Sequence, residues 1–139
     1  MLAGEEGSAV VEFTFLALLL MVPVVYFVVT IGQIQGGSFA VVGAADQAAK
    51  VYVMQDDHQS ATAAAEKAAL IALADHGHTA SHATITIVCD REDCLSAGTA
   101  VTATVDLRVP LPLLPFSDTL RLDAAHLSGT ATQIVGRFR

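Results

Sequence analysis

The feature that most constrains this chain is an uncharged, mostly apolar run from Phe13 to Ile31. As a helix rising 1.5 Å per residue it would be about 28 Å long, close to the hydrocarbon thickness of a bilayer. No charged residue follows before Asp46, and the rest of the 139-residue chain is too short to bury such a helix on all sides. The run therefore predicts one membrane-spanning helix, to which we assign residues 8–37.

A cleaved secretory signal is the alternative interpretation of this run. Signal peptides have a basic flank and an apolar core of about 7–15 residues. Here the run is longer, and its flank carries Glu5 and Glu6. Residues 38–40 nevertheless form a small-x-small pattern, so cleavage after Ala40 and release of a secreted domain stays open.

Proline and glycine mark the course of the predicted membrane helix. Pro23 lies inside the run, where it removes a backbone hydrogen bond, and it predicts a kink. Gly32 and Gly36 have the small-xxx-small spacing that lets another helix approach closely. A flexible exit from the membrane is an equally good interpretation of these glycines.

Two further helical stretches are expected, in residues 38–54 and 60–75. The first either continues the membrane helix as one long rod or starts anew after the glycines. Apolar residues at helical spacing predict its buried face: Phe39, Val42, Ala45, Ala49 and Val53. The second is rich in alanine, and Gly77 is placed to terminate it.

The pattern then changes to the two-residue period of β-strands. Residues 83–89 and 101–109 alternate apolar with polar side chains, and residues 119–133 begin the same way but slip near Ala124. We expect three antiparallel strands with one face covered by helix, and a bulge or bend at the slip. The predicted fold class is α+β, and size favours export of residues 38–139 with the N-terminus in the cytoplasm.

A segment rich in proline and leucine, residues 110–116, joins the second and third predicted strands. Its prolines disfavour both helix and ladder pairing and favour polyproline II. Its apolar side chains would pack on the end of the sheet, or contact a partner or the membrane surface.

Cys89 and Cys94 frame the turn after the first predicted strand. In an exported domain, two cysteines at the end of a hairpin are most simply explained as a disulfide. Their spacing is wider than that of a redox-active pair, so we expect the bond to hold the turn in place.

Three histidines, His76, His78 and His82, lie close together in the sequence. A His-x-His pair on an extended segment places both rings on one face, where a carboxylate or thiolate could complete a metal site. The same stretch also has the composition of a solvated loop, and its spacing fixes no ligand set. A membrane-tethered metal-binding domain is therefore an alternative function; otherwise no cofactor is indicated.

The sequence gives no sign of catalysis or of nucleic-acid binding. Serine, histidine and aspartate are present, but in no nucleophile elbow or phosphate-binding glycine loop. The net charge is −7, with only 7 lysine and arginine residues, whereas phosphate binding needs clustered cations. We expect no enzymatic activity, no small-molecule substrate and no nucleic-acid partner.

Glu12 stands at the start of the apolar run, where a carboxylate is costly. If the chain were cut after Gly7, Ser8 would carry a free ammonium, with Glu12 four residues further on the same helix face. The carboxylate could then meet the ammonium of its own or a neighbouring chain. An interfacial glutamate with its head group in water is an equally good interpretation.

Residues 7–13 read Gly-Ser-Ala-Val-Val-Glu-Phe and lead directly into the apolar run. This segment resembles the processing region of type IV pilin-like proteins. It is most similar to TadE-like proteins, the pseudopilins of tight-adherence (Flp) pilus systems, whose N-termini typically read G-x-A-x-V-E-F. Three further features of this sequence match the pattern of TadE-like proteins: the alanine-rich helix, the late strand of alternating valine and threonine, and the proline-leucine break.

The resemblance implies that residues 1–7 are a leader, which a prepilin peptidase removes by cutting between Gly7 and Ser8. It implies assembly roles for Glu12 and Phe13, with other pilin-like subunits and the pilus assembly machinery as partners. Pilin leaders are usually basic, whereas this one is acidic. The domain is larger than that of the major Flp pilins, which favours a single-pass minor pilin or pseudopilin that enters or primes a surface filament.

Overall fold

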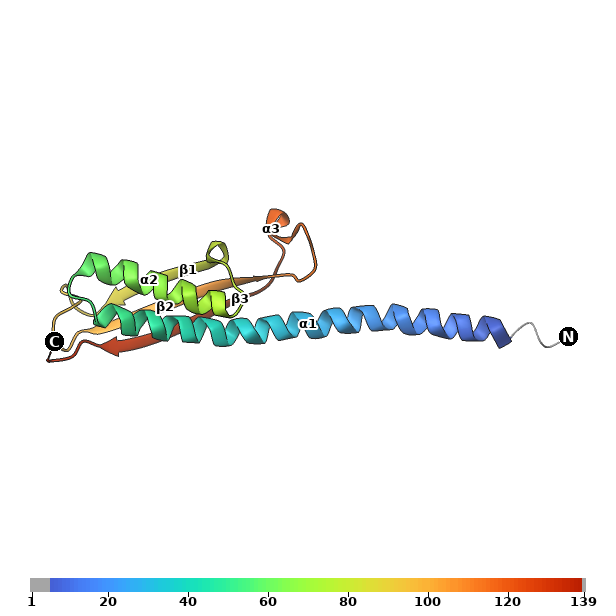
Figure 1. Ribbon diagram of the computed structural model, residues 1–139, viewed down its shortest axis with the longest axis horizontal. Helices are drawn as coiled ribbons and strands as arrows, with labels where there is room; N and C mark the ends of the chain where they lie inside the picture. The colour runs from blue at the N-terminus through green and yellow to red at the C-terminus, as the bar shows by residue number, and fades with distance from the viewer. Residues whose placement is uncertain (1–5, 139) are drawn as a thin grey trace.

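The computed structural model describes residues 6–138 and shows an α+β fold built on one long helix (Figure 1). The elements in chain order are α1 (Glu6–Val53), α2 (His58–Asp75), the 3-10 turn η1 (Ala80–His82), β1 (Ala83–Cys89), β2 (Ala100–Pro110), α3 (Ser117–Leu120) and β3 (Asp123–Ile134). The N-terminal half of α1 projects alone, while α2 and the sheet pack along its C-terminal half. The predicted class, an apolar helix followed by a second helix and a three-stranded antiparallel sheet, is confirmed.

The predicted membrane helix and the stretch 38–54 form one continuous helix. α1 passes through Pro23 without a break and follows a gentle curve rather than a sharp kink. The hydroxyls of Thr14 and Thr30 donate to the carbonyls of Val10 and Tyr26, each at 2.8 Å. These polar groups are therefore satisfied within the helix, as an apolar surrounding requires.

The projecting half of α1 carries its apolar side chains on the outside. A stretch of 18 residues within Gly7–Val53 has a mean hydropathy of 2.6, and none of it is buried. Phe13 is 73% exposed and Leu20 is 67% exposed. By length and composition, α1 is able to span a membrane.

The buried face of α1 is formed mainly by alanines rather than by its largest apolar residues. It comprises Ala40, Val41, Ala44, Ala45, Ala48, Ala49 and Tyr52. The predicted face was partly wrong, because Phe39 and Val42 are 75% and 55% exposed. We call this buried face of α1 the alanine seam. It packs against a row of buried alanines on α2, formed by Ala61, Ala65 and Ala69. Small side chains on both helices allow their backbones to approach closely.

Local signals explain where α2 begins and ends. The helix begins at His58 rather than Ser60, because Asp57 is the N-cap and its Oδ1 accepts the Ser60 N–H at 2.9 Å. Gly77 terminates it as predicted, with φ +79° and its N–H donating to Ala74 at 2.9 Å.

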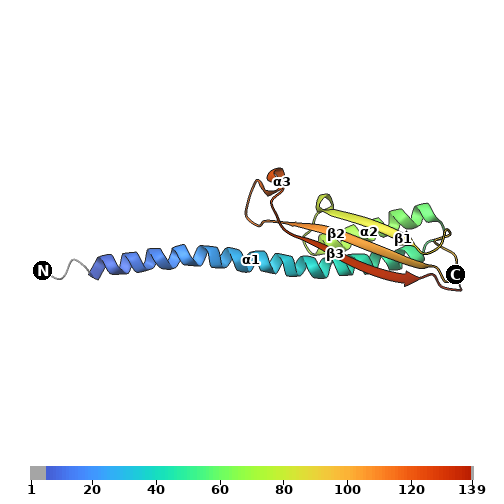
Figure 2. The same cartoon turned by 180° about the vertical axis from the view of Figure 1, so that it is seen from behind.

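The sheet has the order β1-β2-β3, with both pairs antiparallel (Figure 2). The alternating residues of β2 that were predicted to share a face are all buried against the helices: Val101, Ala103, Val105, Leu107 and Val109. The opposite face is polar and open, with the hydroxyls of Thr102 and Thr132 2.9 Å apart. One helical layer therefore covers one face of the sheet, as expected.

The connection between β2 and β3 differs from its prediction. Residues 111–116 form turns rather than polyproline II, and Leu113 has φ 62°. β3 begins at Asp123 rather than Thr119, because residues 117–120 form the short helix α3. The predicted bulge is confirmed: Val109 pairs with Ala125 and Pro110 with Asp123, which leaves Ala124 as the extra residue.

Candidate functional site

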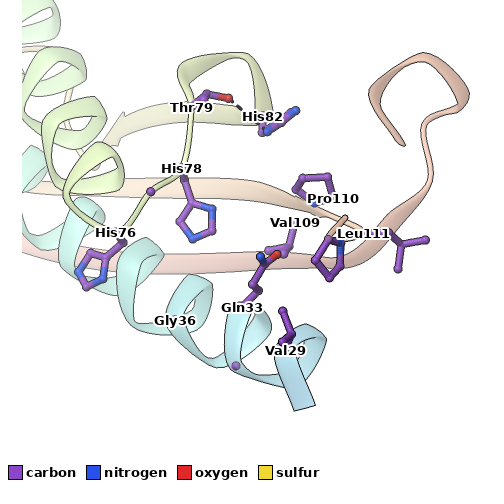
Figure 3. A pocket seen from close by; sticks show the side chains of 13 residues that line it. Val29, Gln33, Gly36, His76, His78, Thr79, His82, Val109, Pro110 and Leu111 are labelled. Atoms are coloured by element: carbon purple, nitrogen blue, oxygen red, sulfur yellow. Dashed lines mark hydrogen bonds between the residues drawn. The ribbon is translucent and has the colours of Figure 1, made fainter. Parts of the chain in front are cut away.

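A pocket of about 570 Å³ lies where α1 leaves the packed domain (Figure 3). Three segments line it: residues 29–36 of α1, residues 76–82 after α2, and residues 109–112 at the end of β2. We call this site the junction pocket. It joins segments that are far apart in the sequence, at the level where the projecting half of the helix begins.

Two sets of residues that the sequence suggested separately meet in the junction pocket. Gly32 and Gly36, predicted for helix contact, line it together with His76, His78 and His82; Figure 3 shows Gly36 and the three histidines around it. A Cβ atom added at Gly32 or Gly36 would meet nothing within 4 Å. These glycines therefore leave space beside α1, and their contact with another helix remains a prediction.

The glycine that α1 uses for packing is Gly37, whose role the sequence analysis missed. A Cβ there would lie 2.7 Å from Leu127 Cδ1 and 3.1 Å from Val109 Cγ2. The side chains of β2 and β3 therefore rest directly on the helix backbone. The available signal was the cost of a second consecutive glycine inside a helix, which usually has a packing reason.

One histidine of the junction pocket has a shifted pKa. Burial lowers the pKa of His78 from its usual 6.5, and electrostatic interactions with His76 and His82 lower it further. The Thr79 hydroxyl and His82 Nδ1 are 3.2 Å apart, so this ring is oriented by the loop itself.

A metal centre gains no support from this arrangement. Figure 3 shows the three rings spread along the pocket rather than gathered at one point. Within residues 6–138, no three His, Cys, Asp or Glu side chains are grouped as metal ligands.

The predicted processing residues lie at the far end of α1 from the domain. Gly7, Ser8, Glu12 and Phe13 are all exposed on its first turns. The predicted leader, residues 1–7, lies outside the described residues except for Glu6 and Gly7. The Gly7–Ser8 peptide bond lies in the first described turn of α1, and its cleavage remains a prediction.

The predicted disulfide between Cys89 and Cys94 is confirmed, with the two Cα atoms 5.4 Å apart. It closes the start of the turn between β1 and β2, at the end of the domain opposite the junction pocket. Hydrogen bonds order the rest of this turn, since the Asp93 carbonyl accepts the hydroxyls of Ser96 and Thr99 at 2.9 and 3.1 Å.

No protein-family model, no curated protein and no solved structure matches this chain. The TadE-like resemblance consequently rests on the sequence motif and stays a prediction.

Proposed function

We propose that this protein is a membrane-anchored structural subunit of the pilin-like class, cleaved after Gly7 by a prepilin peptidase. It would serve as a minor pilin or pseudopilin in a tight-adherence pilus or a related secretion system. The observation that carries the proposal is Glu12, a carboxylate at the start of an exposed apolar helix that runs unbroken into a packed domain.

The division of α1 supports this function. Its C-terminal half holds the domain through the alanine seam, and its N-terminal half projects beyond the domain with its apolar side chains exposed. An apolar helix of this kind is stable in a bilayer or among identical helices of neighbouring subunits, but not in water. A subunit with such a helix can pass from the membrane into an assembly without refolding its domain.

Glu12 supplies the specificity that an apolar helix lacks. After cleavage the new amino group at Ser8 would lie on the same face, within reach of the carboxylate of its own or a neighbouring chain. A carboxylate buried among apolar helices is strongly destabilising unless a cation meets it. This cost would select the one register in which Glu12 of one subunit meets the amino group of another.

The disulfide supports export of the domain. Disulfides persist outside the cytoplasm and are rare inside it. The Cys89–Cys94 bond therefore supports a topology with the domain on the exported side and the N-terminus in the cytoplasm, where the leader would be exposed to a membrane-embedded peptidase.

Release of a secreted domain after Ala40 has less support. Ala40 is fully buried in the alanine seam, and Gly37, which lies before it, contacts both β2 and β3. Cleavage after Ala40 would have to precede folding and would remove part of the packed helix.

Substitution of Glu12 tests the proposed assembly role. We expect Glu12→Ala to stay in the membrane but to lose at least about tenfold of its recovery in complexes with other pilin-like subunits, corresponding to about 1.4 kcal/mol or more. The measurement is co-purification from cross-linked membranes of the native host. Glu66→Ala, on the exposed surface of α2, is the matched control and should assemble normally. Equal recovery of both variants would contradict the proposal.

A further inference from the structure

The loop between β2 and β3 exposes an unusual number of large apolar side chains. We call residues 111–122 the apolar loop. Its exposed members are Leu113 (81%), Leu114 (41%), Phe116 (67%), Leu120 (65%) and Leu122 (42%). None of them belongs to the core of the domain or packs against it. So dense an apolar patch on a small domain marks a contact surface.

The position of the apolar loop points to its partner. Figures 1 and 2 both show it beyond the end of the sheet, on the side toward the projecting half of α1. Its first residues share the junction pocket with Val29 and Gln33 of α1. The apolar run ends at Ile31, so the loop lies at the level where α1 leaves the apolar region.

The backbone of the apolar loop is suited to an apolar surrounding. Pro112 and Pro115 have no N–H to desolvate. The Leu111 N–H donates to the Leu122 carbonyl at 3.2 Å, and the Leu120 N–H donates to the Phe116 carbonyl at 3.0 Å. The first bond joins the two ends of the loop and the second lies within it, and both lower the cost of placing its backbone against lipid.

Charge at the base of the loop fits the edge of a bilayer. Arg121 is exposed beside the apolar side chains, and Arg108 lies 3.9 Å from Asp123 where the loop rejoins the sheet. Arginine at this level can place its aliphatic stem among lipid tails and its guanidinium among phosphates.

We propose that the apolar loop inserts into the interfacial region of the bilayer that α1 spans, as a second membrane contact of the domain. The inference rests on the membrane anchoring contained in the proposed function, and its occupant is the lipid itself. Two contacts, α1 and the loop, fix the tilt of the domain and cover the junction pocket with the membrane surface.

Tryptophan fluorescence tests this contact, because the chain has no tryptophan of its own. The full chain is reconstituted into phosphatidylcholine vesicles with or without brominated acyl chains. Phe116→Trp probes the loop, and Met54→Trp, 74% exposed at the opposite end of the domain, is the matched control. Phe15→Trp, 68% exposed on the projecting half of α1, reports the membrane anchor.

We expect the emission of Phe116→Trp to shift to shorter wavelength and to lose most of its intensity in brominated vesicles. Met54→Trp should be quenched only by aqueous acrylamide. If Phe15→Trp is quenched by bromine while Phe116→Trp behaves like Met54→Trp, the anchor holds and the loop contact is overturned. Shielding of Phe116→Trp that disappears on dilution with lipid would show a second copy as the occupant and would also overturn it. An unquenched Phe15→Trp would remove the membrane anchoring itself, and with it both proposals.

Discussion

Gly129 sets how closely β3 approaches α1. A Cβ at this position would lie 2.5 Å from the Val41 carbonyl carbon and 2.6 Å from its oxygen. Both are backbone atoms, so no side-chain movement can relieve the clash. The close contact between the sheet and α1 therefore requires glycine at position 129, where any side chain would clash.

We expect Gly129→Ala to lower the free energy of unfolding by about 1–3 kcal/mol, the usual cost of overpacking. The measurement is urea unfolding of the full chain in detergent micelles, followed by circular dichroism. Gly43→Ala is the control: it lies in α1 with nothing within 4 Å of the added Cβ, and it should raise stability by up to about 1 kcal/mol. Equal changes for the two variants would contradict the assigned contact.

The lowered pKa of His78 predicts how the stability of the fold depends on pH. Its pKa is lowered in the folded state by burial and by the neighbouring histidines, so the unfolded chain binds more protons. The contribution of His78 to the free energy of unfolding should therefore be constant above its usual pKa of 6.5 and should fall as the pH drops below that value. Melting temperatures measured between about pH 7.5 and pH 5 should show this slope.

His78→Gln should flatten that dependence, while His126→Gln, at an exposed position of β3, should retain it. The same slope in wild type and His78→Gln would show that other groups govern the acid side of the stability curve.

At the scale of elements, the strands were the most predictable part of the chain. The alternation in residues 83–89 and 101–109 matched the buried and exposed faces, because a strand packed on one side needs just this pattern. The slip at Ala124 correctly predicted the bulge. The conformation of the apolar loop was not predictable, since its leucines and prolines do not indicate the left-handed backbone found at Leu113 and Arg121.

The buried face of α1 was the least predictable. Hydropathy favours Phe39 and Val42 as core residues, yet the structure buries alanines and exposes both. The reason is distance: two helices that cross on alanine lie closer together than larger side chains permit. Which face of α1 packs against α2 therefore depends on the small residues of α2, and these cannot be inferred from the local sequence of α1.

The short loop closed by the Cys89–Cys94 disulfide predicts how much stability the bond contributes. Cys89→Ser with Cys94→Ser should lower the free energy of unfolding by about 2 kcal/mol, because the closed loop is short. The loss should appear as faster hydrogen exchange in residues 90–99, while the register of β1 with β2 stays the same. Global loss of the sheet in hydrogen exchange would contradict a role confined to the turn.

At the scale of the whole molecule, the two ends of α1 differ in what surrounds them. The domain end is fixed by the alanine seam, Gly37 and Gly129, and the free end carries Glu12 and the predicted cleavage site. The sequence predicted the free end from composition and motif. It could not predict the junction pocket, because that site needs Gly32 of α1, His78 of a loop and Val109 of a strand to meet in space.

The central claim is that the chain is processed as a pilin-like subunit, and the N-terminal residue with the intact mass of the membrane-extracted protein tests it most directly. In cells with a prepilin peptidase we predict a chain that begins at Ser8 and has the mass of residues 8–139. Gly7→Leu should prevent the cut, while Gly32→Leu, in the same helix but distant from the site, should be cut normally. A chain that keeps residues 1–7 in the presence of the active peptidase would contradict the account.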